Sequence, residues 1–235
     1  MVTQAAESVR LCLIRHGQGS LGTSDYDRLS ELGKRQGAML GDRIRIDYGD
    51  ACQVWSGSLK RHRQTLELIA PERSGLIDDA LNEYTVSELV RSAVAQADSL
   101  DLALPDDGAF ADPKAYLATF LAWFPEVLEA WQSQSLRCVH NGSWPDFQRR
   151  VLSPVEQWQR ALAGGRSAVV VSSAGVISTI VASLLDRDLN WQRQLNIALY
   201  NASITELVVD KSGRWQALRI NCIEHLPEEQ LQTLA

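Results

Sequence analysis

The sequence contains no apolar run long enough to cross a membrane. A spanning helix needs roughly 20 apolar residues, whereas the longest runs here, residues 168–171 and 176–185, are broken by Ser, Gly or Asp within a few positions. Residues 1–10 also lack the charged segment followed by an apolar segment that marks a secretory signal peptide. We therefore expect no membrane partner and no export signal.

Cysteine is scarce and widely spaced. The 235 residues include four cysteines and no Cys-x-x-Cys pair, which argues against a disulfide framework and against a zinc site. A lone cysteine within a strand usually behaves as a small buried apolar residue. We expect a protein of the reducing cytoplasm with no metal and no other cofactor. The four are Cys12, Cys52, Cys138 and Cys222.

Lys and Arg form no long basic stripe, and the formal net charge is −6. Nucleic acid is therefore not an expected partner, although a local positive pocket is compatible with a negative total. The chain is 45% hydrophobic and 22% charged, as expected for one globular domain over residues 1–235 with room for an insertion. Most of its seven tryptophans fall on core-like helical positions, which favours burial within one chain over an interface.

Short apolar runs alternate with helical patterns, which is typical of a layered α/β fold. Residues 167–172 are almost wholly apolar, as in a central strand of a parallel sheet covered on both faces. We therefore predict a three-layer sandwich with a mostly parallel central sheet between helices, plus a helical insertion. Further strands are expected at residues 9–14, 52–56, 203–209 and 215–221, the last two around a turn at 210–213, and helices at 31–46 (N-cap Ser30), 59–69 (stopped by Pro71) and 176–185.

The middle of the chain, from about residue 82 to 141, is mostly helical. We interpret it as an insertion that roofs the functional site at one end of the sheet, and the alternative that it only enlarges the core stays open. Apolar positions from Tyr116 to Trp131 repeat at helical spacing, and Pro125 is expected to bend or divide that helix. A second pattern, from 144 to 162, contains Pro154.

Three polar clusters follow predicted strands: residues 15–18 (Arg-His-Gly-Gln), 58–63, and 172–175 (Ser-Ser-Ala-Gly). In open α/β sheets ligands bind beyond the carboxyl ends of the strands, so we expect the three clusters to meet there. A lone histidine at a strand end is more often structural than nucleophilic. The functional interpretation of His16 therefore depends on the polar residues around it.

Residues 60–63 (Lys-Arg-His-Arg) begin a predicted helix, where the macrodipole is positive and each cation costs roughly 0.3–1 kcal/mol. We expect Lys60 and Arg63 to extend into solvent. Basic side chains and the N–H groups of a helix N-terminus also make an anion site, and Arg61 is expected to point inward, beside Arg15. Two guanidinium groups would hold phosphoryl oxygens and spread their charge without a metal ion.

The same segments resemble known motifs. Residues 13–18 (Leu-Ile-Arg-His-Gly-Gln), with 29–33 and Gln36, look like the opening of the histidine phosphatase superfamily, the phosphoglycerate-mutase-like group. Residues 54–65 resemble its second motif. The resemblance extends over nearly the whole chain, and the later segments that fit it are residues 81–84, 144–151, 168–177, 201–207 and 221–226.

This resemblance implies roles for individual residues. His16 would attack phosphorus in line and form a phosphohistidine, while Arg15 and Arg61 bind the phosphoryl oxygens. Glu83 stands where the family keeps its acidic proton donor, and would protonate the leaving oxygen and later activate water; Glu88 or another carboxylate stays open for that role. Two more residues are expected to line the phosphate pocket, or else to be surface turn residues: Gln18 and Ser58.

One position departs from the family pattern. The turn after the central strand normally carries a second histidine, and this chain has Ser173 there. A serine hydroxyl would donate a hydrogen bond to phosphate or cap the next helix, but it carries no charge, a loss worth roughly a few kcal/mol in the transition state. His62 is expected to face elsewhere because it neighbours Arg61 on a helix, His140 lies in a loop, and His225 is expected to be structural.

The preferred interpretation is metal-independent hydrolysis of a phosphate monoester through His16, with a small phosphorylated substrate or inorganic phosphate as the partner. A phosphate-binding protein without turnover is the main alternative, because Ser173 weakens the site. A phosphoglycerate mutase is less favoured, since nothing in the sequence marks a phosphoglycerate site. A serine hydrolase is disfavoured further, because its nucleophile elbow needs glycine where Val171 stands.

Overall fold

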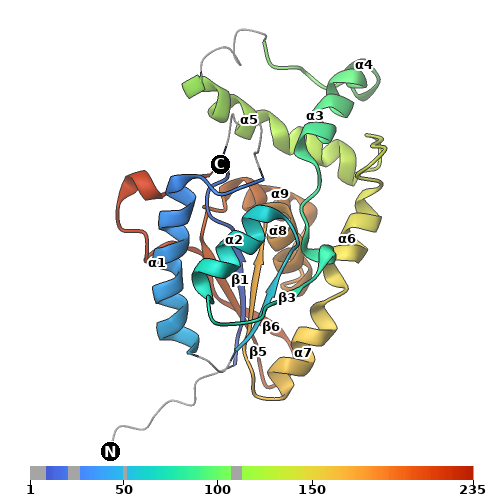
Figure 1. The fold of residues 1–235 in the computed structure, drawn as a ribbon. Coiled ribbons are helices and arrows are strands. Elements are labelled where there is room, and N and C mark those ends of the chain that lie inside the picture. Colours follow the sequence, from blue (N-terminus) through green and yellow to red (C-terminus); the bar gives the residue numbers. More distant parts are fainter. Residues whose placement is uncertain (1–8, 21–26, 50–51, 107–112, 235) are drawn as a thin grey trace, which may run out of the picture.

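The computed structural model describes residues 9–20, 27–49, 52–106 and 113–234. Its centre is a six-stranded sheet (Figure 1). Residues 1–8, part of the segment in which no signal peptide is expected, lie outside the described residues. In order across the sheet the strands are β3 (Leu76–Ile77), β2 (Gln53–Ser56), β4 (Ala168–Ser172), β1 (Leu11–Arg15), β5 (Ile204–Val209) and β6 (Trp215–Cys222).

β4 is the central strand that the sequence predicts. All five of its residues are buried, and it pairs in parallel with β1 on one side and β2 on the other. β2 also pairs in parallel with β3, whereas β5 is antiparallel to both β1 and β6. In the turn of the predicted β5–β6 hairpin, Gly213 has a φ of 83°, which favours glycine. The mostly parallel sheet with a closing hairpin is confirmed.

The helices begin close to their predicted positions. α1 begins at Glu31, and the predicted N-cap Ser30 accepts a hydrogen bond from the backbone N–H of Gly33 at 3.0 Å. The α-helices are α1 (Glu31–Tyr48), α2 (Lys60–Ile69), α3 (Val86–Ala95), α4 (Ala97–Leu100), α5 (Pro113–Gln132), α6 (Trp144–Leu152), α7 (Val155–Ala163), α8 (Ala174–Leu184) and α9 (Leu189–Ala198), and two short 3-10 helices are η1 (Asp79–Leu81) and η3 (Glu229–Leu231).

The strands send alternate side chains into two apolar cores, so both faces of the sheet must be covered. On one face, Leu11 and Leu13 of β1 join buried side chains of α5 to α9. On the other face, Cys12 and Ile14 join buried side chains of α1 and α2. Burying a leucine or isoleucine completely stabilises the fold by about 1.5–3 kcal/mol. The predicted three-layer sandwich is confirmed, and Figure 1 shows α2 in front of the sheet and α8 behind it.

The two internal prolines have different effects. Pro125 lies inside α5, which continues through it to Gln132, so the proline does not divide the helix. Pro154, by contrast, separates α6 from α7 at Ser153. Proline removes one backbone donor and clashes with the preceding turn. The single helical pattern at 144–162 is therefore two helices.

The middle region contacts the rest of the molecule through aromatic rings. Figure 1 places α3, α4 and α5 beyond the end of the sheet at which β1 and β4 finish. Trp131 of α5 packs edge-on against Trp144 of α6, outside the region, with ring centroids 5.2 Å apart, and within the region against Tyr84 at 5.3 Å. The region therefore also extends the core. That it is an insertion roofing the active site stays a proposal.

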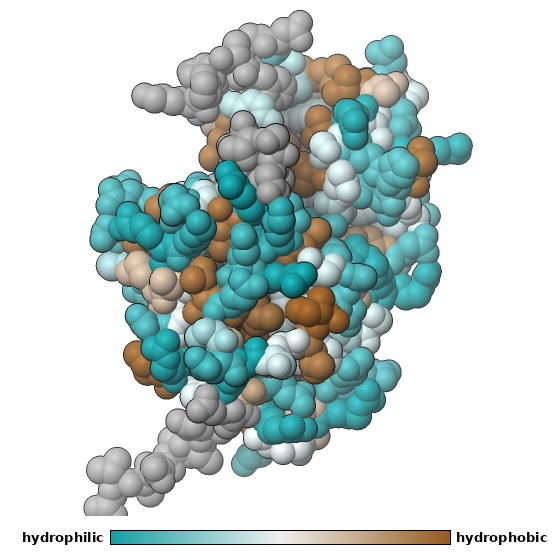
Figure 2. All heavy atoms as spheres, viewed as in Figure 1, coloured by the Kyte–Doolittle hydropathy of each residue, from teal (hydrophilic) through white to brown (hydrophobic). Residues whose placement is uncertain are grey.

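The surface is mixed. On the face drawn in Figure 2, hydrophilic side chains cover most of the area and apolar ones form separate patches. Among the helices of the described residues, none combines the length and the apolar character that crossing a lipid bilayer requires.

Candidate active site

His16 is held rigidly at the end of β1. Its backbone N–H donates to the carbonyl of Ser172 at the end of β4, 2.9 Å away, and its carbonyl accepts from the N–H of Ala202 at 3.1 Å. The next residue must be glycine, because a Cβ at Gly17 would overlap the carbonyl oxygen of Gly33 in α1. The end of the central sheet and the first turn of α1 thus fix the backbone of His16 from two sides. Its side chain is only 5% exposed.

The hydrogen bonds of His16 define its protonation. Nδ1 lies 2.7 Å from the carbonyl oxygen of Gly17, which can only accept, so Nδ1 carries the hydrogen. Nε2 accepts a hydrogen bond from Nε of Arg61 at 3.1 Å. Burial, and after it the positive charge of Arg61, hold the pKa of His16 well below the usual value of a histidine. The ring is therefore neutral, with its lone pair on Nε2.

Arg61 points inward, as predicted, from the first turn of α2. Its Nη1 forms an ion pair with Asp27 at 2.6 Å, and its Nη2 lies 3.5 Å from the hydroxyl of Ser173. Asp27 also accepts the backbone N–H of Lys60 at 2.9 Å, so this carboxylate caps α2 and positions Arg61. Lys60 and Arg63 are exposed, as predicted. No pattern in the sequence identifies Asp27 as part of the site.

Arg15 reaches the site from the end of β1. Its Nη1 donates to the backbone carbonyl of Leu199, just after α9. Its charge contributes, together with that of Arg61, to lowering the pKa of His16. The structure thus brings both predicted guanidinium groups into the electrostatic environment of His16.

Glu83 lies at the N-terminus of α8. Its carboxylate accepts the backbone N–H of Gly175 at 2.7 Å and that of Tyr84 at 3.2 Å. Burial raises the pKa of Glu83 above the usual value of a glutamate, against the Gly175 hydrogen bond and the charges of Arg61 and Arg15, which lower it. A carboxyl group that keeps its proton to higher pH is suited to donate one.

Glu88, the alternative proton donor, serves another purpose. Its two oxygens accept the backbone N–H groups of His140, at 2.6 Å, and Asn141, at 2.8 Å. Burial alone would raise the pKa of Glu88, but these N–H groups hold it below its usual value. The ionised carboxylate anchors the loop before α6.

His225 is partly buried, and burial lowers its pKa to about 4, in keeping with a structural role.

Arg150 of α6 anchors the segment that leads to Glu83. Its Nη1 lies 2.8–3.1 Å from three backbone carbonyls, those of Asp79, Ala80 and Asn82. These include two carbonyls of η1, which a cation stabilises at the helix C-terminus. The sequence did not identify Arg150, because its contacts join positions about 70 residues apart.

We expect Arg150→Ala to lower the free energy of unfolding by about 2–3 kcal/mol, since hydrogen bonds to a charged group are worth roughly 1.5–3 kcal/mol. Urea denaturation checks this. The neighbouring Arg149→Ala is the matched control, because within the described part of the chain Arg149 makes only an exposed ion pair with Asp146. It should cost less than about 0.5 kcal/mol. Equal losses in the two variants would show that Arg150 does not anchor the segment.

Ser173 and His62 contact each other. Ser173 is 2% exposed and occupies the N-cap position of α8, but its hydroxyl makes no capping hydrogen bond there. The hydroxyl instead lies 2.6 Å from Nε2 of His62. His62 is completely buried, with its ring centroid 5.4 Å from that of His16. The expectation that His62 faces away from the site is wrong, because the first turn of α2 is enclosed on more than one side and two successive residues face the site.

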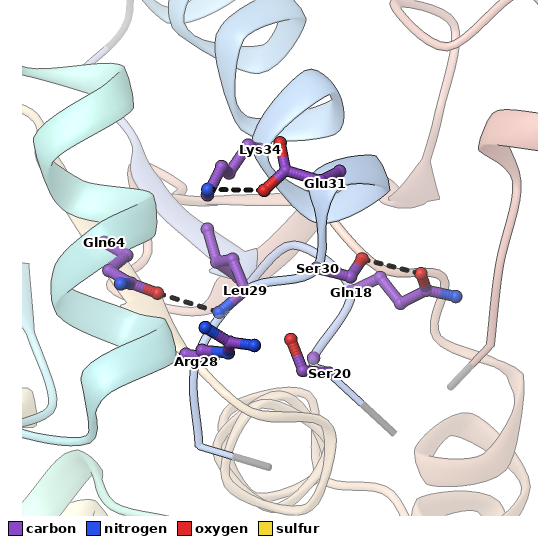
Figure 3. A pocket seen from close by; sticks show the side chains of 9 residues that line it. Gln18, Ser20, Arg28, Leu29, Ser30, Glu31, Lys34 and Gln64 are labelled. Atoms are coloured by element: carbon purple, nitrogen blue, oxygen red, sulfur yellow. Dashed lines mark hydrogen bonds and ion pairs between the residues drawn. The ribbon is translucent and has the colours of Figure 1, made fainter. Parts of the chain in front are cut away.

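Gln18 and Ser58 are tied to other polar groups. Gln18 accepts a hydrogen bond from Ser30 at 2.8 Å and lines a pocket of about 430 Å³ beside the start of α1 (Figure 3). Ser58 donates to Asp79 and accepts from Asn82 at 2.8 Å. Phosphate binding by these two residues stays a prediction. The other residues lining the pocket are Gly19, Ser20, Arg28, Leu29, Ser30, Glu31, Lys34 and Gln64.

Among the described residues, no group of three or more His, Cys, Asp or Glu side chains is arranged to hold a metal ion. The four cysteines are free thiols. Two guanidinium groups, those of Arg61 and Arg15, supply positive charge close to His16.

Comparison with known proteins identifies the family and the fold. The family model of the histidine phosphatase superfamily (branch 1) matches residues 11–105 and 116–223. A curated relative, 2-carboxy-D-arabinitol-1-phosphatase of Triticum aestivum, is 26% identical over 231 residues, which cover 94% of this chain and 42% of the relative. The chain thus spans less than half the length of that relative.

Solved structures share the fold. One is a phosphoserine phosphatase of Entamoeba histolytica in complex with phosphoserine, with a TM-score of 0.60 and 18% identity, covering 93% of this chain and 99% of the other. Another is a mycobacterial glucosyl-3-phosphoglycerate phosphatase in complex with VO3, with a TM-score of 0.58 and 23% identity, covering 92% of this chain and 100% of the other. At these identities the likeness establishes the fold.

Proposed function

The chain belongs to the histidine phosphatase superfamily, and from that premise we propose that it hydrolyses phosphate monoesters, without a metal ion, through a phosphohistidine on His16. The observation that supports this most directly is the state of His16. The ring is buried and neutral, Gly17 holds the hydrogen on Nδ1, and Nε2 is directed at Arg61. A neutral imidazole with its lone pair toward a cation is arranged to attack a bound phosphoryl group.

Substrate binding would use the fixed positive charge around His16. In the proposed complex, the phosphoryl oxygens take over the hydrogen bond that Nε of Arg61 gives to His16. Arg15 and the N–H groups at the start of α8 add positive potential, and Ser173 adds a hydroxyl. These groups neutralise the charge of the transferring phosphoryl group, which is the main task of an enzyme that catalyses phosphoryl transfer.

The reaction would proceed in two displacements. Nε2 of His16 forms a bond to phosphorus while the bond from phosphorus to the ester oxygen breaks, and Glu83 gives its proton to that leaving oxygen. Glu83, now a carboxylate, takes a proton from a water molecule. The resulting hydroxide oxygen bonds to phosphorus, the phosphorus–nitrogen bond breaks, and inorganic phosphate leaves. His16 and protonated Glu83 are restored.

For the substrate we propose a small phosphorylated molecule. The phosphatases similar to this chain bear the names of small phosphorylated acids and of a sugar derivative. In our proposal the region of about residues 82–141 roofs the site and selects among such molecules. The free thiols of all four cysteines accord with the reducing cytoplasm, which we propose as the location.

A binding protein without turnover is the second candidate, and Ser173 is the observation in its favour, since its hydroxyl adds no charge to the site. Both candidates would bind phosphate, and ligand binding raises the melting temperature by mass action. Release of phosphate from an ester distinguishes them.

The test is phosphate release from an aryl phosphate and from a panel of natural monoesters, with a chelator present, between pH 5 and 8. We expect sustained turnover, with a preference among the natural esters. A raised melting temperature in phosphate together with no release from any ester would refute the phosphatase and favour the binding protein.

A further inference from the structure

His62 is a buried imidazole that the proposed mechanism does not use. It follows Arg61 in α2 and is completely inaccessible to solvent. Its Nε2 lies 2.6 Å from the hydroxyl of Ser173. Its ring lies beside that of His16, with 5.4 Å between centroids and 36° between planes. A second histidine thus borders the phosphate site, although it comes from α2 and not from the turn after β4.

The backbone before α2 is shaped around this ring. A Cβ at Gly57 would overlap Nδ1 of His62, so only glycine leaves the space that the ring occupies. The same Cβ would lie 2.7 Å from the side-chain oxygen of Asn82, which accepts the N–H of Ser58 at 2.8 Å. The turn therefore closes tightly over the imidazole.

The contacts of His62 determine which of its nitrogens carries hydrogen. Burial, and after it the charge of Arg61, hold the pKa of His62 well below the usual value, so the ring is neutral and has one N–H. Nδ1 is buried with no hydrogen-bond partner among the described residues. A buried N–H without an acceptor is rarer and costlier than a bare lone pair. The hydrogen therefore lies on Nε2 and is donated to Ser173.

The hydroxyl hydrogen of Ser173 must then point to another acceptor. Its two side-chain neighbours, Nε2 of His62 and Nη2 of Arg61 at 3.5 Å, both act as donors. The hydroxyl makes no capping hydrogen bond within α8. An oxygen that accepts from two neighbours donates its own hydrogen to a third group, and the site of Arg61 and His16 is where a phosphoryl oxygen would lie.

We propose that His62 is the positioning residue of Ser173: its N–H holds the serine so that the hydroxyl donates to a phosphoryl oxygen of the bound substrate. This rests on the proposed function of the site. In this arrangement, α2 supplies the imidazole that the turn after β4 lacks, and it acts through the serine. The pair forms a relay of two hydrogen bonds to the phosphoryl group.

A double-mutant cycle tests the relay, with kcat and KM for an aryl phosphate measured for His62→Ala, Ser173→Ala and the double variant. Because His62 acts through Ser173, we expect each single change to lower kcat by about 10–100-fold, and the double variant to match Ser173→Ala within about two-fold. Losses that multiply would overturn the proposal, as would a lower melting temperature with kcat unchanged.

A matched pair at His62 separates the relay from packing. The amide nitrogen of His62→Gln reaches the place of Nε2, whereas that of His62→Asn reaches only the place of Nδ1. Gln should therefore recover most of kcat and Asn should not, while both lose the ring. Equal activity in the two variants would contradict the relay.

Activity of the unmodified protein distinguishes a missing relay from a missing phosphatase activity. If the unmodified protein turns over and the His62 variants match it, the phosphatase stands and the relay is refuted. If the unmodified protein does not turn over, the phosphatase is refuted. The same cycle is then measured on the dissociation constant of inorganic phosphate by calorimetry, where the relay again predicts that the two losses do not multiply.

Discussion

His16→Ala is expected to lower phosphate release from any monoester by at least about 10⁴-fold. Without the imidazole of His16, no side chain accepts the phosphoryl group and the covalent pathway is lost. The remaining cationic groups of the site would still bind phosphate. The backbone contacts of His16 with Ser172 and Ala202 do not depend on its side chain. The variant should therefore fold, and phosphate should still raise its melting temperature. Steady-state kinetics and thermal denaturation measure the two properties.

The control for this variant is His140→Ala. His140 is exposed, and its described hydrogen bond to Glu88 uses the backbone N–H, so activity should stay within about two-fold. If His16→Ala kept more than about one hundredth of the activity, the covalent pathway through His16 would be excluded, because that residual rate would require another acceptor for the phosphoryl group.

Glu83→Gln is expected to lower kcat/KM by about 10²–10⁴-fold for alkyl phosphates, the usual worth of a general acid. Aryl phosphates with good leaving groups need little protonation, so their loss should be much smaller. Glutamine keeps an oxygen that accepts from Gly175. A loss equal for both classes of ester would show that Glu83 is not the proton donor.

The pH profile of kcat/KM gives the same assignment. His16 must be neutral, and its lowered pKa places the acid limb well below pH 6.5. Glu83 must be protonated, and its raised pKa places the basic limb above the usual range of a glutamate. Activity should fall as the pH rises through the pKa of Glu83, and Glu83→Gln should abolish that limb. Glu88→Gln is the control: it should lower stability through the loop at Asn141 and leave the limb in place.

Much of the fold follows from local patterns. The apolar run at 167–172 identifies the central strand because only a strand covered on both faces tolerates so many apolar residues in succession. Ser30 caps α1, and the turn at 210–213 forms the hairpin, because both depend on neighbouring residues. The sequence could not show whether α5 continues through Pro125, because tertiary packing determines whether a helix continues through a proline.

The site was predicted only in part. Arg15 and His16 are predicted from a polar cluster at a strand end, whereas Glu83 is predicted from the resemblance to the family. The structure gives His16 a contact with Arg61 and Glu83 one with Gly175, and the catalytic roles of these residues stay predictions. The role of Asp27 could not be predicted from the sequence, because its contact with Arg61 joins residues 34 positions apart. The prediction that His62 faces away from the site is wrong because helical spacing alone does not show how many sides of a helix are buried by the rest of the fold.

The central claim, that His16 receives the phosphoryl group, is tested most directly by rapid acid-free quenching during turnover of an isotopically labelled aryl phosphate. A good leaving group makes formation of the intermediate fast relative to its hydrolysis. We expect up to one label per chain, stable to alkali and labile to acid, on the peptide that contains His16. Label on any other residue, or steady turnover with no labelled protein, would contradict it.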